Sequence, residues 1–122
     1  MKQHIHERTK HEALTGLIQE LKKASIEQDV KLWKAVAVEL ERPTRLHRSV
    51  NVFKIDANAH DGETVLVPGK VLSMGALNKK LTVAAYKFSA EAQKKINQNG
   101  KAVTIQELLK ENPKGQNVRI IG

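Results

Sequence analysis

The stretch VLVPGKVLSMGALNKKLTVAAYKFS, Val65 to Ser89, decides the fold because it alternates short apolar runs with turn-forming residues. Its first run, Val65 to Val67, predicts a short buried strand that ends at a Pro68–Gly69 turn. Lys70 to Met74 can continue as a second short strand. The longer run from Leu81 to Phe88 is rich in β-branched and aromatic residues and predicts a third strand.

The loop inside this stretch carries the first candidate contacts with a polyanion. Gly69 and Gly75 can take a positive φ or let another backbone approach closely, which is useful at a contact surface. Lys79 and Lys80 end the loop, so strands on either side would hold a basic segment in place. This arrangement suits phosphate binding, although an ordinary charged loop has the same pattern.

The net charge favours a polyanionic partner. The chain has 122 residues, enough for one domain, and 21 Lys and Arg against 13 Asp and Glu give a formal charge of +8. Such a basic excess in a small chain points to nucleic acid before membrane. A basic surface that serves only solubility is the alternative.

Several protein classes are excluded or disfavoured by what the sequence lacks. There is no cysteine, so disulfides and thiolate metal sites are excluded. No apolar run approaches the ~20 residues of a membrane helix, and the N-terminus lacks the apolar core of a signal peptide. We therefore expect a cytoplasmic protein without a membrane partner. Because aromatic residues are few, we expect binding through charge and shape rather than through base stacking.

Motifs of catalysis and of small-molecule binding are also missing. A phosphate-binding P-loop needs Gly-x-x-x-x-Gly-Lys-Ser/Thr, whereas Ala76 follows Gly75. The sequence contains neither a Gly-x-Gly-x-x-Gly nor a Gly-x-Ser-x-Gly motif. We expect no enzymatic activity, no cofactor and no small-molecule substrate.

Residues 1–11 predict a flexible basic arm that becomes ordered on RNA, with Arg8 and Lys10 as contacts. Histidines at a His-x-His spacing in this arm could also bind a metal ion. No recognisable set of carboxylate or thiol ligands accompanies them, so we predict no metal site.

Two amphipathic helices are expected next, at Glu12 to Ala24 and at Val30 to Glu41. Ser25 to Asp29 would connect them, with Asp29 as the N-cap of the second helix. The short connection predicts an antiparallel helical hairpin. The apolar stripe of the second helix consists of Trp33, Val36, Ala37 and Leu40.

The segment ERPTRLHRSVN is the densest guanidinium cluster in the chain, and no acidic residue lies between Arg42 and Lys54. Arginine binds phosphate with two parallel hydrogen bonds, so this segment predicts RNA contact. A solvated loop between a helix and a strand is the alternative. The candidate contacts are Arg42, Arg45, His47 and Arg48.

Val50 to Ile55 predicts a strand, and Asp56 to Glu63 predicts a turn before the next strand. The turn gathers His60 with three acidic residues, and an enzyme using them for acid–base chemistry is a third functional hypothesis. Tight turns favour Asp, Asn and Gly, which explains the composition better.

The C-terminal third predicts two more helices and a strand. Ser89 would cap a helix from Ala90 to Asn99 that ends at Gly100. Thr104 to Glu107 is a capping box that opens a short helix. Val118 to Ile121 would form a final strand.

Three ordered segments together resemble the eighteen-e family of large-subunit ribosomal proteins in its archaeal form. They are LERPTRLHRSVNVFKI (Leu40 to Ile55), Val65 to Ile96, and ENPKGQNVRIIG at the C-terminus. The resemblance spans about Glu12 to Gly122. It implies an α/β fold, in which an N-terminal helical hairpin precedes one domain of short strands and helices in an irregular β-β-α superhelix.

The resemblance also implies a structural constituent of the large ribosomal subunit, cytoplasmic and without catalysis. Its partners would be large-subunit ribosomal RNA and neighbouring large-subunit proteins. We expect one ribosomal-protein domain at residues 12–122, after the arm. A non-ribosomal basic nucleic-acid-binding module remains the alternative. The expected RNA-binding residues are Arg8, Lys10, Arg42, Arg45, His47, Arg48, Lys70, Lys79 and Lys80.

Overall fold

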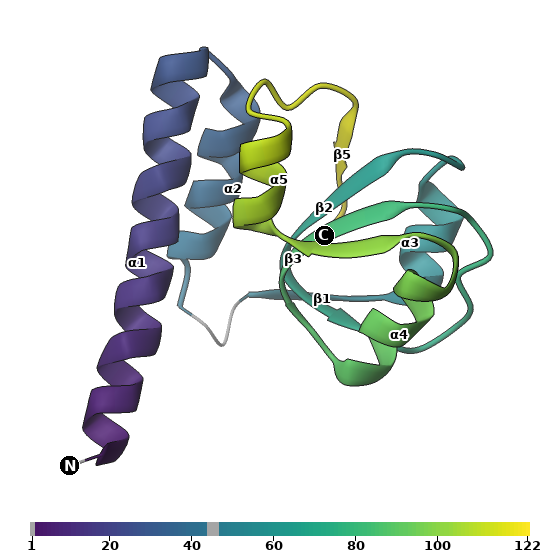
Figure 1. The fold of residues 1–122 in the computed structure, drawn as a ribbon, viewed down its shortest axis with the longest axis horizontal. Helices are drawn as coiled ribbons and strands as arrows, with labels where there is room; N and C mark the ends of the chain where they lie inside the picture. Colours follow the sequence, from purple (N-terminus) through teal and green to yellow (C-terminus); the bar gives the residue numbers. More distant parts are fainter. Residues whose placement is uncertain (1, 44–46) are drawn as a thin grey trace.

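A computed structural model of the chain describes residues 2–43 and 47–122, with the side chains of residues 2–11 outside the description. Within that part, five helices and five strands form an α/β fold around a parallel sheet, as predicted for the fold class (Figure 1). In chain order they are α1 (Lys2–Gln28), α2 (Lys31–Glu41), β1 (Arg48–Asn51), α3 (Val52–Asn58), β2 (Thr64–Leu72), β3 (Thr82–Phe88), α4 (Ala90–Asn99), β4 (Lys101–Thr104), α5 (Ile105–Glu111) and β5 (Val118–Ile120).

The sheet has the strand order β1-β2-β3-β4, and β5 also pairs with β2. All of these pairs are parallel. β1 pairs with the C-terminal half of β2, where Arg48 lies opposite Gly69, and β5 pairs with its N-terminal half, where Val118 lies opposite Thr64. Two short strands therefore share one edge of β2, and β3 occupies the other.

Helices cover both faces of the sheet, with α1, α2 and α5 on one side and α3 and α4 on the other (Figure 1). Val65 and Val67 belong to the core beneath α3 and α4, whereas Leu66 between them belongs to the core beneath the other helices. This alternation follows from the two-residue period of a strand. Burial on both faces explains why the central strands read as continuous apolar runs.

The N-terminal helical hairpin is confirmed, but its boundaries differ from the prediction. α1 begins at Lys2, because no Gly or Pro interrupts residues 2–11, and it ends at Gln28. Asp29 does not cap α2; it takes a positive φ of 54° in the turn, and Val30 holds the N-cap position without a side-chain hydrogen bond. The predicted apolar stripe of α2 is buried as expected.

The strand predicted at Val50 to Ile55 is wrong, because only its start is extended. β1 ends at Asn51, and the helix α3 follows at once. Val52 and Ile55 are both fully buried, and their spacing of three residues suits one face of a helix rather than a strand. A short β-branched sequence therefore forms a helix here because tertiary packing overrides propensity.

The turn predicted at Pro68–Gly69 is also wrong. β2 continues through both residues, and a register shift relative to β3 lies between Val67 and Lys70. Such an irregularity accommodates a proline, which has no N–H to donate to the ladder. At Gly69, a Cβ atom would lie 2.0 Å from the carbonyl oxygen of Arg48, so glycine permits the close approach of β1.

The C-terminal helices form with the predicted caps. Ser89 Oγ accepts a hydrogen bond from the Ala92 N–H at 3.2 Å, and Thr104 Oγ accepts one from the Glu107 N–H at 3.1 Å. The strand β4 was not predicted, and β5 ends one residue early, at Ile120. Trp33 Nε1 donates to the Pro113 carbonyl at 2.7 Å, which fastens the C-terminal segment to the helical hairpin.

Replacing Thr104 with alanine should lower the free energy of unfolding by about 1 kcal/mol, because α5 loses its N-cap oxygen. Urea denaturation measures the change. Gln106→Ala is the control, since Gln106 is exposed in the same helix and has no capping role. Equal stabilities for the two variants would contradict the capping assignment.

Candidate nucleic-acid interface

A row of residues crosses three strands near the junction of the sheet with the helical hairpin. Ser49 on β1 is opposite Lys70 on β2, and Lys70 is opposite Lys87 on β3. Neighbouring strands lie about 4.8 Å apart, so the two lysines stand side by side. Like charges directly opposite one another are destabilising, which makes this pair unfavourable unless an anion neutralises it.

The row borders a hollow of about 190 Å³, which we call the basic hollow. It lies where the start of β1 and the ends of β2 and β3 meet. None of its described lining residues is acidic. They are His47, Arg48, Ser49, Gly69, Lys70, Tyr86 and Lys87.

Aromatic contacts fix one wall of the basic hollow. The rings of His47 and Tyr86 meet edge to face, with centroids 5.9 Å apart and planes at 87°. A ring nitrogen of His47, Nε2, lies 3.1 Å from the Leu40 carbonyl oxygen, which ties the segment before β1 to the end of α2. Lys87 Nζ lies 5.5 Å from the centroid of the Tyr86 ring, a cation–π distance.

Arg42 and Arg48 share one carboxylate beside the basic hollow. The Nε atom of each lies 3.7 Å from Glu39 Oε2. These partly exposed pairs contribute little stability, and two guanidinium groups on one carboxylate leave a positive excess. The segment from Arg42 to Lys54 has no acidic residue of its own, but in the fold Glu39 of α2 lies next to two of its arginines.

Three predicted contacts cannot be assigned a side-chain position. Arg45 lies outside the described residues. Arg8 and Lys10 belong to α1, but their side chains lie outside the description, as do those of the N-terminal histidines. Their roles remain predictions.

Lys79 and Lys80 lie beyond the other end of β3, up to roughly 25 Å from Lys87 at ~3.3 Å per residue. Lys79 is half-buried, and its Nζ donates to the carbonyls of Asp56 and Ala59, the latter at 2.7 Å. It holds the C-terminal end of α3, where a cation is favourable. Lys80 is exposed beside Lys101 in a second hollow of about 320 Å³.

We expect Lys79→Met to lower the free energy of unfolding by about 2 kcal/mol, because two partly buried carbonyls lose a charged donor. Lys80→Met should change it by less than about 0.5 kcal/mol, since that side chain is exposed. Thermal and urea denaturation of both variants tests the difference. If the two variants were equally stable, Lys79 would have no structural role.

The acids of the predicted turn accept hydrogen bonds that hold loops together. Asp56 Oδ1 accepts the Asn78 N–H at 3.0 Å, and Asp61 Oδ1 accepts the Lys80 N–H at 2.5 Å. Glu63 accepts the His60 N–H and, at 3.2 Å, the Nε–H of Arg119. The hydrogen bond from His60 lowers the pKa of the Glu63 carboxyl, against a smaller opposing effect of desolvation, and Arg119 lowers it further.

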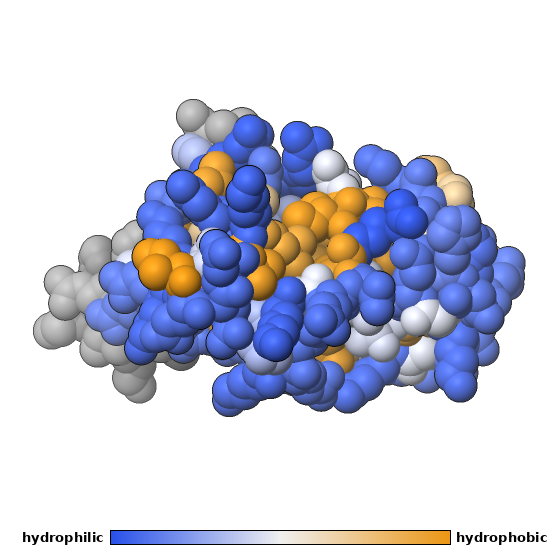
Figure 2. Space-filling view, turned by 90° about the horizontal axis from the view of Figure 1, so that it is seen from above, coloured by the Kyte–Doolittle hydropathy of each residue, from blue (hydrophilic) through white to orange (hydrophobic). Residues whose placement is uncertain are grey.

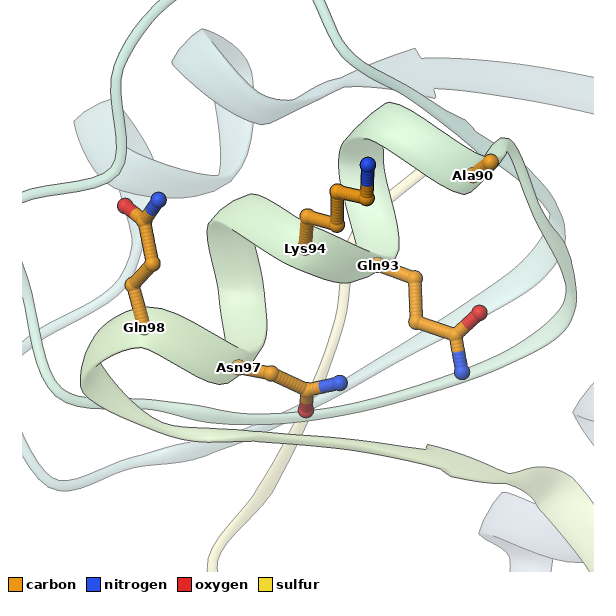
Figure 3. A pocket seen from close by; sticks show the side chains of 5 residues that line it. All are labelled: Ala90, Gln93, Lys94, Asn97 and Gln98. Carbon is orange, nitrogen blue, oxygen red and sulfur yellow. The ribbon is translucent and has the colours of Figure 1, made fainter.

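A broader hollow of about 550 Å³ lies along the outer face of α4 and is lined mainly by amides (Figure 3). Its side chains carry no acid, base or nucleophile apart from one lysine, and Asn97 Oδ1 accepts the Ala102 N–H at 2.9 Å. The lining residues are Ala90, Gln93, Lys94, Asn97 and Gln98. We assign no chemistry to this surface.

The surface is mainly hydrophilic in the view from above, with an apolar region over the junction between the helical part and the sheet (Figure 2). Among the described residues, no helix is both long and apolar enough to cross a membrane. In the same part of the chain, no group of three His, Cys, Asp or Glu side chains could hold a metal ion.

Sequence reasoning missed Lys87 and Tyr86 at the basic hollow. Lys87 is the only charged residue between Leu81 and Phe88, and an isolated charge in such a strand was the available signal. Its register opposite Lys70 could not be read from the sequence, because the parallel pairing of β2 with β3 was not predicted.

The fold and the basic hollow define a small basic α/β protein whose parallel sheet presents a cationic surface. Residues 30–104 match the model of a family described as ribosomal proteins, which unites 50S-L15 and 50S-L18e with a counterpart from the 60S subunit. The chain therefore belongs to this ribosomal-protein family. The resemblance noted in the sequence is confirmed.

Three archaeal relatives are each called large ribosomal subunit protein eL18. The relative from Methanosphaerula palustris is 50% identical over 109 residues, 88% of this chain and 90% of that protein. The one from Haloarcula marismortui is 45% identical over 108 residues, 88% of this chain and 93% of that protein. The one from Thermoplasma acidophilum is 46% identical over 110 residues, 89% of this chain and 92% of that protein.

Proposed function

We propose that this chain is a structural constituent of the large ribosomal subunit in the cytoplasm and that it binds large-subunit ribosomal RNA through the basic hollow. Membership of a ribosomal-protein family supports the first part. The observation that carries the second part is the direct pairing of Lys70 with Lys87 across two strands. Phosphate groups would turn this repulsion into two favourable contacts.

Within this proposal, Arg48, Lys70 and Lys87 bind phosphates at the basic hollow, and His47 positions the segment before β1. Arg42 and Arg45 extend the cationic surface toward the end of α2. Further contacts come from residues outside this surface, and neighbouring large-subunit proteins complete the environment. These further residues are Arg8, Lys10 and Lys80, and Lys79, whose amine is held by the Asp56 and Ala59 carbonyls, supports the loop that presents Lys80.

The proposal includes no catalytic step. Asp56, Asp61 and Glu63 each accept a backbone hydrogen bond that holds an adjacent loop. RNA binding is the only activity that the proposal assigns to the basic hollow.

Binding to deproteinised large-subunit ribosomal RNA, compared with bulk tRNA and duplex DNA, tests the proposal. We expect tighter binding to the ribosomal RNA and a logarithmic salt slope of about −0.7 to −0.9 per neutralised phosphate. Equal affinity for all three nucleic acids would instead support a general basic module without a ribosomal target.

A further inference from the structure

Two large apolar side chains are exposed on residues whose backbones are neighbours beyond the ends of β1 and β2. Phe53 is 51% exposed and Met74 is 66% exposed. Their backbones are joined, because the Phe53 N–H donates to the Met74 carbonyl at 3.0 Å. We call this pair the apolar knob.

The loop that carries Met74 is held by side chains from two other elements. Asn51 Oδ1 accepts the Met74 N–H at 3.2 Å. Lys95 on α4 donates to the carbonyls on either side of Met74, to Ser73 at 2.6 Å and to Gly75 at 2.7 Å. The backbone around Met74 is therefore held by hydrogen bonds, although the Met74 side chain is exposed to solvent.

Gly75 allows the loop to approach Phe53 closely. Its φ is +97°, a conformation that favours glycine, and a Cβ atom there would lie 2.4 Å from the Cβ of Phe53. Leu77, in the same loop, is buried in the core. The same loop thus buries the Leu77 side chain and exposes the Met74 side chain. The exposure of Met74 is therefore not a general property of the loop.

The charge around the apolar knob favours RNA over an apolar protein partner. No acidic residue occurs between Glu63 and Glu91 in the sequence, and Lys54 is exposed next to Phe53. The nearest acid along α3 is Asp56, whose carboxylate accepts a backbone N–H from the same loop. An exposed lysine beside the apolar pair, with the neighbouring acid engaged by the loop, suits a nucleobase attached to a phosphate backbone.

The apolar knob is also close to the basic hollow along the strands. Asn51 pairs with Leu72, two residues beyond the pair of Ser49 with Lys70. Phe53 and Met74 are each four residues beyond that pair, so at ~3.3 Å per residue they lie within about 13 Å of the hollow. A single RNA segment could reach both.

We propose that Phe53 and Met74 pack against an unpaired nucleobase of the RNA whose phosphates occupy the basic hollow, an inference that rests on the proposed function. Every base has a π-face, so stacking on Phe53 does not require a particular sequence. The thioether of Met74 adapts to irregular apolar surfaces. This proposal adds base stacking to the charge and shape recognition expected from the sequence.

Fluorine NMR of the full chain labelled with 4-fluorophenylalanine gives a direct test, because the chain has two phenylalanines. Phe88 is half-buried against the core and serves as the internal reference. The probes are a short single-stranded RNA of mixed sequence and the duplex formed with its complement. We expect the single strand to shift the Phe53 resonance more than the Phe88 resonance, and we expect the duplex to leave the Phe53 resonance nearly unchanged.

A binding measurement complements the spectrum. The variant Phe53→Leu/Met74→Gln should bind the single strand about tenfold more weakly, with an unchanged salt slope because no charge is removed. The control variant Ile26→Gln/Val38→Gln removes another exposed apolar pair, 82% and 49% exposed, and should bind as the wild type does.

The outcomes separate this proposal from the proposed function. If the wild type binds the single strand but the Phe53 resonance stays in place and the knob variant binds equally well, the knob proposal fails while RNA binding stands. The knob would then be a surface for a neighbouring protein. If the wild type binds neither of these probes nor deproteinised large-subunit ribosomal RNA, both proposals fail.

Discussion

Gly69→Ala should lower the free energy of unfolding by about 3 kcal/mol, measured by urea denaturation. The added Cβ would lie 2.0 Å from the Arg48 carbonyl oxygen and 2.9 Å from its carbonyl carbon. These are backbone atoms of β1, so relief requires that the strand move away from β2 rather than that a side chain rotate. The same movement would disturb the basic hollow, to which both residues belong.

Gly16→Ala is the matched control, because it is the same chemical change in an open environment. Gly16 is inside α1, and apart from the neighbouring backbone of that helix no described atom lies within 4 Å of the position that its Cβ would occupy. Alanine in a helix interior is favoured by about 1 kcal/mol, so this variant should be more stable than the wild type. A Gly69→Ala protein as stable as the wild type would show that β1 does not pack closely against β2.

The variant Lys70→Gln/Lys87→Gln should bind large-subunit ribosomal RNA about a hundredfold more weakly, because two charge-assisted phosphate contacts are lost. The slope of log K against log salt should fall in magnitude by about 1.5. The free protein should be no less stable, and a small gain is expected, because the repulsion between adjacent lysines is removed. Filter binding over a salt series and urea denaturation measure both effects.

The control for this variant is Lys31→Gln/Lys34→Gln, which removes the same charge from exposed positions on α2. It should reduce affinity far less. If the two double variants bound equally weakly, affinity would depend on net charge alone and the basic hollow would have no particular role.

Local signals in the sequence were sufficient to predict most of the helices and the central strands. The caps at Ser89 and Thr104 depend on residues three positions apart, and the apolar stripe of α2 depends on a 3.6-residue period. These capping and periodicity signals lie within a few consecutive residues of the sequence. The fold class itself was predicted from the family resemblance and is confirmed.

Features that depend on contacts between distant segments could not be predicted. Val52 to Ile55 forms a helix because its apolar pair packs beneath the sheet, and Pro68 lies inside a strand because β2 has an irregularity there. The pairing of Lys70 with Lys87 requires the register of two parallel strands. Glu39 reaches Arg42 and Arg48 only after α2 folds back toward β1.

Lysine reactivity in the free protein and in the assembled large subunit tests the central claim most directly. Both states would be treated with an amine-acetylating reagent, and the modified residues identified by mass spectrometry. Lys79 should react poorly in both states, because carbonyl oxygens hold its amine. We predict that Lys70 and Lys87 react readily in the free protein and are protected in the subunit. Equal reactivity of these two lysines in both states would contradict RNA binding at the basic hollow.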